Sequence, residues 1–234
     1  MSFLLFFSSS VLISYFSIYT WSPWCPQGAK GLGFDCAPML WGDKHIDPWV
    51  KNVINGPDNY AKYALGMNEP NEKSQANIDP WHAAGLWQQY IQPLKNRGYT
   101  LISPACTNGP DGKEWMKNFI DACKGCTIDA IAVHYYGTSA QGMIDHSEDY
   151  FNTFGKPIWI TEAACQDFSG RNQQCNQGQI FDFMNKVKGY VNSSPHVQTF
   201  FPFGVMHDMY NVNPLNQLMS GSGQPTDLGW SFLG

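Results

Sequence analysis

Two glutamates each close a short apolar run, and their type and placement suit one kind of chemistry. Glu69 ends the run 63–69, and Glu162 ends the run 157–162. A facing pair of carboxylates can cleave a glycosidic bond, one as general acid and the other as nucleophile or base. A lone glutamate at such a position is most often a solvated loop residue or a helix cap. Two at matching strand ends favour a functional pair.

Eight β-favouring runs could carry these glutamates on the strands of a parallel barrel. Amphipathic or turn-rich stretches separate the runs, an order typical of parallel strands joined by helical crossovers. Helical spacing predicts helices over 79–97, 112–124 and 176–192, the last with an apolar stripe from Ile180 to Val191. In a barrel of this kind, residues at the C-terminal strand ends gather at one face. The predicted strands are 3–7, 11–19, 34–41, 63–69, 100–105, 129–136, 157–162 and 198–205.

We therefore expect one domain over residues 1–234, an α/β fold of the compact (β/α)8 TIM-barrel type, with any irregularity at the N-terminal strands. Only residues 8–10 separate the first two predicted strands, whereas a parallel crossover normally needs about ten or more residues. The apolar N-terminus lacks a positive region and a clear small-residue cleavage site. We interpret it as barrel strands; a degraded signal sequence is the alternative.

Composition argues against several classes of partner. The formal net charge is −5, only 14% of residues are charged, and no basic run exists, so nucleic acid is not an expected partner. No stretch of ~20 uninterrupted apolar residues predicts a membrane span. The chain has 9 Trp, 11 Tyr and 15 Phe. Most of these rings must be core, but the excess also fits flat carbohydrate substrates.

We expect the protein to be a monomer.

Seven cysteines favour disulfides and an oxidising compartment. Three pairs are close in sequence, and Cys106 is left over. A zinc site at Cys123 and Cys126 lacks a second pair of ligands, and a redox site lacks the usual flanking pattern. We expect an extracellular or cell-wall location. The close pairs are Cys25 with Cys36, Cys123 with Cys126, and Cys165 with Cys175.

The predicted strand 129–136 adds two candidate site residues. Strand alternation puts His134 and Tyr136 on one face with small alanines, while Tyr135 shares the opposite, apolar face. Polar residues above small ones fit a barrel interior that opens into a site. We expect His134 and Tyr136 to belong to the site, with Tyr136 donating a hydrogen bond to the nucleophile. The alternative is a buried pair satisfied by backbone groups.

Five short motifs, taken in order, resemble glycoside hydrolase family 128. Members of this family are mainly fungal and bacterial β-1,3-glucanases, and the resemblance covers nearly the whole chain from about residue 14. Any one motif alone would be weak. The motifs are PMLWG at 38–42, LGMNEPN at 65–71, ISPA at 102–105, IAVHYYG at 131–137 and WITEA at 159–163.

The resemblance implies a retaining endo-β-1,3-glucanase acting on laminarin-type glucan, without metal or cofactor. Glu69 would be the general acid/base, and Glu162 the nucleophile that must stay ionised. Asn68 would bond the sugar 2-hydroxyl. A glucan-binding protein without turnover, or a hydrolase of another β-glucan, are the alternatives.

Aromatic residues near the predicted strand ends are candidates for glucan binding. Trp21 and Trp41 follow the second and third predicted strands, at the same end as the glutamates. Trp24 lies in a loop, Tyr135 on the sixth strand, and Phe168 beyond the seventh. Phenylalanines occupy the eighth strand, where related barrel glycosidases often carry a tryptophan. The floor of the sugar site therefore differs from the wider pattern.

Overall fold

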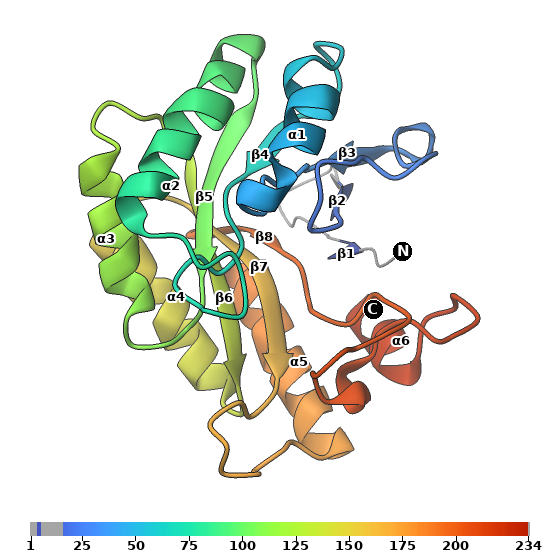
Figure 1. The fold of residues 1–234 in the computed structure, drawn as a ribbon. Helices are drawn as coiled ribbons and strands as arrows, with labels where there is room; N and C mark the ends of the chain where they lie inside the picture. The colour runs from blue at the N-terminus through green and yellow to red at the C-terminus, as the bar shows by residue number, and fades with distance from the viewer. Residues whose placement is uncertain (1–3, 6–15, 234) are drawn as a thin grey trace.

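A curled, parallel five-stranded sheet forms the centre of the protein (Figure 1). The computed structural model describes residues 4–5 and 16–233. The strand order matches the chain order, as expected when each strand is followed by a crossover. Its strands are β4 (Tyr63–Leu65), β5 (Thr100–Cys106), β6 (Ala130–Gly137), β7 (Ile158–Cys165) and β8 (Val197–Phe200).

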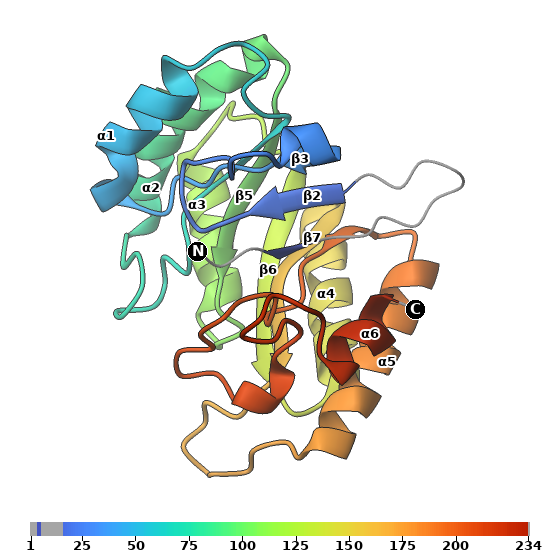
Figure 2. The same cartoon turned by 90° about the vertical axis from the view of Figure 1, so that its right-hand side faces the viewer.

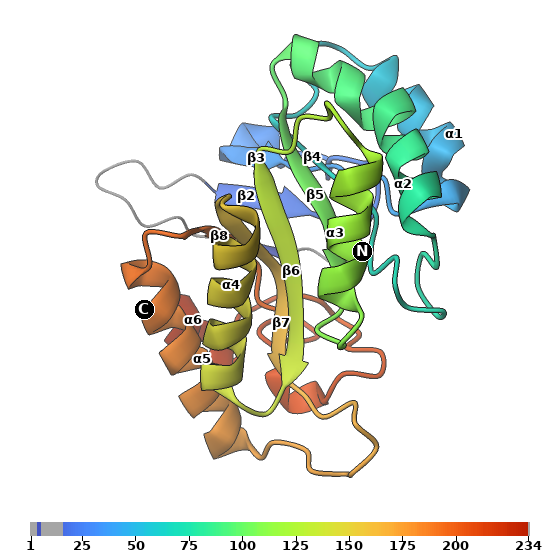
Figure 3. The same ribbon diagram turned by 90° about the vertical axis from the view of Figure 1, so that its left-hand side faces the viewer.

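Helices cover the outer face of this sheet, with α3 and α4 lying beside β6 in Figure 3. The helix predicted over 176–192 is confirmed as α5, whose predicted apolar stripe from Ile180 to Val191 is buried. A capping box of Asn176 and Gln179 begins this helix. The α-helices are α1 (Ile46–Trp49), α2 (Pro80–Leu86), α3 (Gly112–Ala122), α4 (Ala140–Phe154), α5 (Gln177–Ser193) and α6 (Asp227–Leu233).

The helix predicted over 79–97 is confirmed in position but not in regularity. Asp79 caps α2, which then continues as a π-helical segment, Trp87–Ile91, and a 3₁₀ segment, Gln92–Arg97. Pro93 lacks an N–H and cannot continue an α-helical ladder, which explains the change of helix type. Further 3₁₀ or π segments span Lys30–Leu32, Asp43–His45, Val50–Ile54 and Pro214–Asn216.

The N-terminal strands form a second, three-stranded sheet of β1 (Leu4–Leu5), β2 (Phe16–Tyr19) and β3 (Phe34–Cys36). Strand β2 runs parallel to β3, but β1 runs antiparallel to β2. The prediction of a parallel first strand is therefore wrong: residues 6–15 separate the two strands, which is at the lower limit for a parallel crossover but enough to connect antiparallel neighbours. The rest of the predicted strands 3–7 and 11–19 lies outside the described residues.

Residues 38–41 connect the two sheets through backbone hydrogen bonds to β4. Leu40 N–H donates to Leu65 O at 3.0 Å, and Leu65 N–H donates to Pro38 O at 2.9 Å. Strands β2 and β3 thus lie on the side of the main sheet away from α3 and α4, as Figure 2 shows. The described strands form an open parallel half-barrel that continues into the N-terminal sheet.

Tyr19 joins β2 to the far strands of the main sheet. Its buried hydroxyl donates to Thr161 O at 2.6 Å, and its ring meets Phe201 edge-on with centroids 4.9 Å apart. These contacts hold the N-terminal sheet against β7 and against the residue that follows β8.

All three predicted disulfides are present, and Cys106 is free and buried. Cys25–Cys36 ties the loop after β2 to β3, and Cys165–Cys175 closes the loop after β7. None of the helices in the described part of the chain is long and apolar enough to cross a membrane.

We predict that Tyr19→Phe lowers the free energy of unfolding by about 1–3 kcal/mol, because the buried Thr161 carbonyl loses its hydroxyl partner. Urea denaturation followed by tryptophan fluorescence measures the change. Tyr210→Phe, which removes a hydroxyl from an exposed ring, is the control and should stay within about 0.5 kcal/mol of the parent. Equal stability of the two variants would contradict a stabilising role for this hydrogen bond.

Candidate active site

The two glutamates lie at the same end of the sheet, on β7 and just after β4. Regular pairing of β4 ends at Leu65, but Asn68 forms a further parallel bridge with Ala105. The Glu69 N–H then donates to Ala105 O at 2.7 Å, and Pro70 ends the ladder because it has no N–H. The position of Glu69 is thus set by the edge of β5.

A shift in register sets the position of Glu162. Val133 pairs with Ile160, yet the next residue of β6, His134, pairs with Glu162. Thr161 is therefore an extra residue on β7. It forms a β-bulge, a feature that often changes the direction of side chains beside active sites. The bulge brings the Glu162 carboxylate next to the imidazole of His134.

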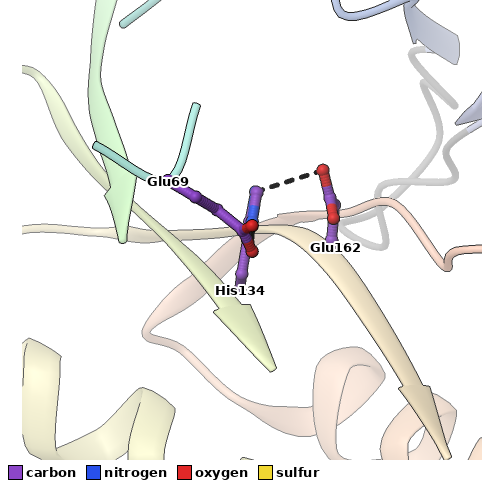
Figure 4. Close-up of side chains that lie close together, drawn as sticks. All are labelled: Glu69, His134 and Glu162. Carbon is purple, nitrogen blue, oxygen red and sulfur yellow. Dashed lines mark hydrogen bonds and ion pairs between the residues drawn. The ribbon is translucent and has the colours of Figure 1, made fainter. Parts of the chain in front are cut away.

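His134 lies between the two carboxylates, as Figure 4 shows. Its Nδ1 is 2.9 Å from Glu69 Oε1, and its Nε2 is 3.5 Å from Glu162 Oε1. One carboxylate oxygen of each glutamate and one ring nitrogen of His134 all lie within 4.8 Å of one another. The three residues are 7%, 0% and 5% exposed for Glu69, His134 and Glu162. Such a cluster could also ligate a metal ion, although carboxylate-pair hydrolysis needs none.

Two further donors reach Glu162, one to each oxygen. Trp21 Nε1–H donates to Oε1 at 2.5 Å, and the Tyr136 hydroxyl donates to Oε2 at 2.5 Å. The bond from Tyr136 agrees with the sequence-based expectation. Trp21 comes from the end of β2, so the N-terminal sheet contributes directly to this site.

Burial and charge act in opposite directions on the groups of this cluster. Burial raises the pKa of Glu162; attraction to His134 opposes this rise, repulsion from Glu69 adds to it, and the Tyr136 and Trp21 bonds oppose it. Burial lowers the pKa of His134, but Glu162 and Glu69 outweigh burial and raise it above the ordinary histidine value. A charged Glu162 therefore depends on its hydrogen-bond donors.

Asparagine side chains fix the strand ends that carry these groups. The Asn108 amide accepts from Tyr136 N–H at 3.0 Å and donates to Tyr136 O at 3.1 Å, as a neighbouring strand would. Asn71 similarly accepts from Thr107 N–H at 3.0 Å and donates to the Thr107 hydroxyl at 2.7 Å. These bonds satisfy backbone groups where the ladder ends, and so hold the site rigid.

Strained backbone concentrates around the cleft. Trp21, Glu69 and Tyr210 have φ values of 51°, 42° and 52°, in the left-handed region that bulky residues rarely adopt. Each such residue costs on the order of 1 kcal/mol and persists only where its surroundings hold it in place. All three line the same cleft, which makes a role in function the simplest explanation of the strain.

The cleft above the carboxylates measures about 1490 Å³, larger than the ~300–1,000 Å³ usual for one small ligand. It has room for several sugar rings. Both glutamates and most of the predicted binding residues line it. The predicted binding residues that it brings together are Trp21, Trp24, Trp41, Asn68, Tyr136 and Phe168.

Two predicted binding residues do not line the cleft. Tyr135 points to the helices, as strand alternation requires, and packs against Phe183 and His146. His134 is fully buried beneath the carboxylates, so it can position Glu69 and Glu162 but does not reach a substrate in this arrangement.

Sequence reasoning missed several residues of the cleft. The Lys44 ammonium lies 3.4 Å from the ring centroid of Trp41 and covers part of that ring, and both residues line the cleft. Tyr210 and Asn211 approach from the loop after β8. Loop residues of this kind carry no periodic signal, although the asparagines directly after strands could have been noticed as strand-end partners.

Solved structures similar to this one include β-1,3-glucanases and oligosaccharide-binding proteins of glycoside hydrolase family 128. A subgroup VI exo-β-1,3-glucanase from Aureobasidium namibiae matches with TM-score 0.80 and 25% identity over 93% of this chain and 84% of that chain. A subgroup II endo-β-1,3-glucanase from Sorangium cellulosum matches with TM-score 0.79 and 27% identity over 92% and 88%. A subgroup VII oligosaccharide-binding protein from Cryptococcus neoformans matches with TM-score 0.73 and 27% identity over 86% and 79%.

Sequence comparison points to the same family. Alkali-sensitive linkage protein 1 of Schizosaccharomyces pombe is 32% identical over 173 residues, which cover 72% of this chain but only 32% of that relative. The chain thus spans about a third of the length of this curated relative. The model of the glycosyl hydrolase catalytic core matches residues 5–232. The chain belongs to the glycosyl hydrolase catalytic core family and resembles the β-1,3-glucanases of glycoside hydrolase family 128.

Proposed function

We propose that the protein is a retaining endo-β-1,3-glucanase that hydrolyses laminarin-type glucan by double displacement. The observation that carries this proposal is the proximity of Glu69 and Glu162: one carboxylate oxygen of each residue lies within 4.8 Å of one of the other. Retaining glycosidases hold their carboxyl groups ~5–5.5 Å apart, whereas inverting enzymes leave ~6.5–9.5 Å for a water. The short distance supports direct attack on the sugar.

In the first step, Glu162 attacks the anomeric carbon while Glu69 gives its proton to the leaving glycosidic oxygen. The C–O bond to the leaving sugar breaks, and an ester bond to Glu162 forms. In the second step Glu69 takes a proton from water, the resulting hydroxide attacks the same carbon, and Glu162 is released. Each step inverts the anomeric carbon, so the two together retain its configuration.

His134 and the donors to Glu162 prepare the pair for these steps. The His134 imidazole contacts both carboxylates, one with each ring nitrogen, and so helps to keep them facing each other. Trp21 and Tyr136 bond the two oxygens of Glu162, which favours its ionised form against burial. Asn68, at the cleft surface, can bond the sugar 2-hydroxyl.

Exposed aromatic rings in the lining of the cleft support a glucan as substrate. Trp24 and Phe168 are exposed rings in the cleft, and apolar rings pack on the C–H faces of sugars. The β-1,3 linkage and the endo mode rest on the likeness to the Sorangium cellulosum enzyme. An extracellular or cell-wall monomer completes the proposal; the three disulfides support the extracellular location.

A glucan-binding protein without turnover is the second candidate. The match to an oligosaccharide-binding protein from Cryptococcus neoformans favours it, because the same fold there carries a binding function. Binding of laminari-oligosaccharides with no product after prolonged incubation would select this candidate over the hydrolase.

We predict that Glu69→Gln and Glu162→Gln each lower kcat on laminarin by about 10³-fold or more, because each removes one half of the catalytic pair. Release of reducing ends measures activity. Circular dichroism and thermal unfolding check that the variants keep the fold.

Glu72→Gln is the matched control, since Glu72 is another carboxylate in the cleft with no place in the proposed reaction. It should retain activity within a few-fold. Near-normal turnover in either catalytic variant would rule out the assigned pair.

We predict that Tyr136→Phe raises the pKa of Glu162 and so shifts its ionisation to higher pH, because it removes a donor that opposes the effect of burial. The indole N–H of Trp21 reports this ionisation, since it donates to Glu162. Its NMR resonance, followed against pH, gives the midpoint. The acidic limb of the pH–rate profile should move in the same direction. If the pH midpoint of the Trp21 resonance is unchanged or lower in Tyr136→Phe, the role given to Tyr136 is contradicted.

A further inference from the structure

The loop after β8 brings an unassigned aromatic ring to the rim of the cleft. Tyr210 is 74% exposed and lines the cleft together with Asn211. Neither residue takes part in the chemistry of Glu69 and Glu162. A large ring left in water contributes little to folding, so its exposure needs a reason other than core packing.

The backbone at Tyr210 is strained, and hydrogen bonds hold the turn around it. Its φ of 52° lies in the left-handed region, which costs a residue with a side chain about 1–2 kcal/mol. The Tyr210 N–H donates to Asp208 Oδ1 at 2.8 Å, and the Val212 N–H donates to Met209 O at 2.9 Å. The turn therefore holds the ring outward at a cost to stability, a combination typical of functional positions.

A small hydrophobic core supports this turn from below. Trp21 and Tyr136, the two donors to Glu162, pack against the same core, so the turn and the nucleophile share one rigid support. The buried residues of this core are Ala164, Phe203, Met206, Met209 and Val212.

Side-chain amides fix the far end of the loop to β7 and the segment that follows it. The fully buried Asn216 amide accepts from Cys165 N–H at 3.0 Å and donates to Cys165 O at 3.0 Å. Gln166 Oε1 accepts from the Asn213 N–H at 2.6 Å. Because the backbone that carries the Tyr210 ring is fixed in this way, the loop loses little freedom when a ligand binds, and such preorganisation raises affinity.

We propose that Tyr210 and Asn211 form a rim subsite that binds one glucosyl unit of a neutral β-glucan chain. The sugar's C–H face packs on the Tyr210 ring, and the Asn211 amide bonds a sugar hydroxyl. This subsite deepens the proposed function and rests on it for the substrate class. Because it lies on the rim, only oligosaccharides long enough to reach it from the carboxylates gain affinity.

Calorimetric titration of Glu162→Gln with laminari-oligosaccharides of increasing length tests the subsite without turnover. Adding Tyr210→Ala should weaken binding of the longer oligosaccharides by about 5- to 30-fold and leave the shortest ones unchanged. Tyr210→Trp should restore the affinity. Trp81→Ala is the matched control, because Trp81 is 66% exposed and does not line the cleft.

A second variant separates binding from folding. Tyr210→Gly relieves the strain at this position, so its Tm should equal or exceed that of the parent while its affinity for long oligosaccharides falls as in Tyr210→Ala. A positional role in folding alone would instead lower Tm together with affinity, and that result would overturn the proposal.

The outcomes distinguish the subsite from the proposed function. If Glu162→Gln binds long oligosaccharides and Tyr210→Ala binds them as tightly as Trp81→Ala does, the subsite is wrong and the glucanase proposal stands. If the unmodified protein binds oligosaccharides through Tyr210 but releases no product, the subsite stands and turnover is wrong. If the unmodified protein binds no laminari-oligosaccharide, both are wrong.

Discussion

Two carboxylates buried within 4.8 Å of one another are the constraint on which the rest of the site depends. At an effective dielectric constant of ~20, two unit charges at this distance repel by on the order of 3 kcal/mol, and burial adds to the cost. His134 offsets part of it by contacting both groups. Trp21 and Tyr136 offset more at Glu162. The site is therefore stable only while β6 and the segment after β2 hold these donors in place.

Much of the scaffold serves this arrangement. The bulge at Thr161 sets Glu162 beside His134, and Tyr19 bonds the carbonyl of that same extra residue. Asn108 and Asn216 pair with the ends of β6 and β7 where the ladder stops. Backbone geometry at the site is thus fixed by side chains from neighbouring loops, which hold the strand ends that carry the site residues.

The sequence allowed the glutamates, the disulfide pairs, the α5 stripe and the inward face of β6 to be predicted, because each follows from local periodicity or spacing. It did not reveal the antiparallel β1, and it left open whether His134 is buried or faces the cleft. Both depend on how distant strands pair, which the local sequence of one strand does not specify. Tyr210 was missed for a related reason: its exposure comes from a turn with positive φ at a tyrosine, a conformation that residue types do not favour.

The central claim is that Glu69 and Glu162 act as a retaining pair. The most direct test is proton NMR of the first sugar released during hydrolysis of a β-1,3-linked laminari-oligosaccharide, recorded before mutarotation. Double displacement at this carboxylate spacing predicts that the β-anomer forms first and the α-anomer appears only later. Initial release of the α-anomer would mean a single displacement by water, and would contradict the assignment of Glu162 as nucleophile.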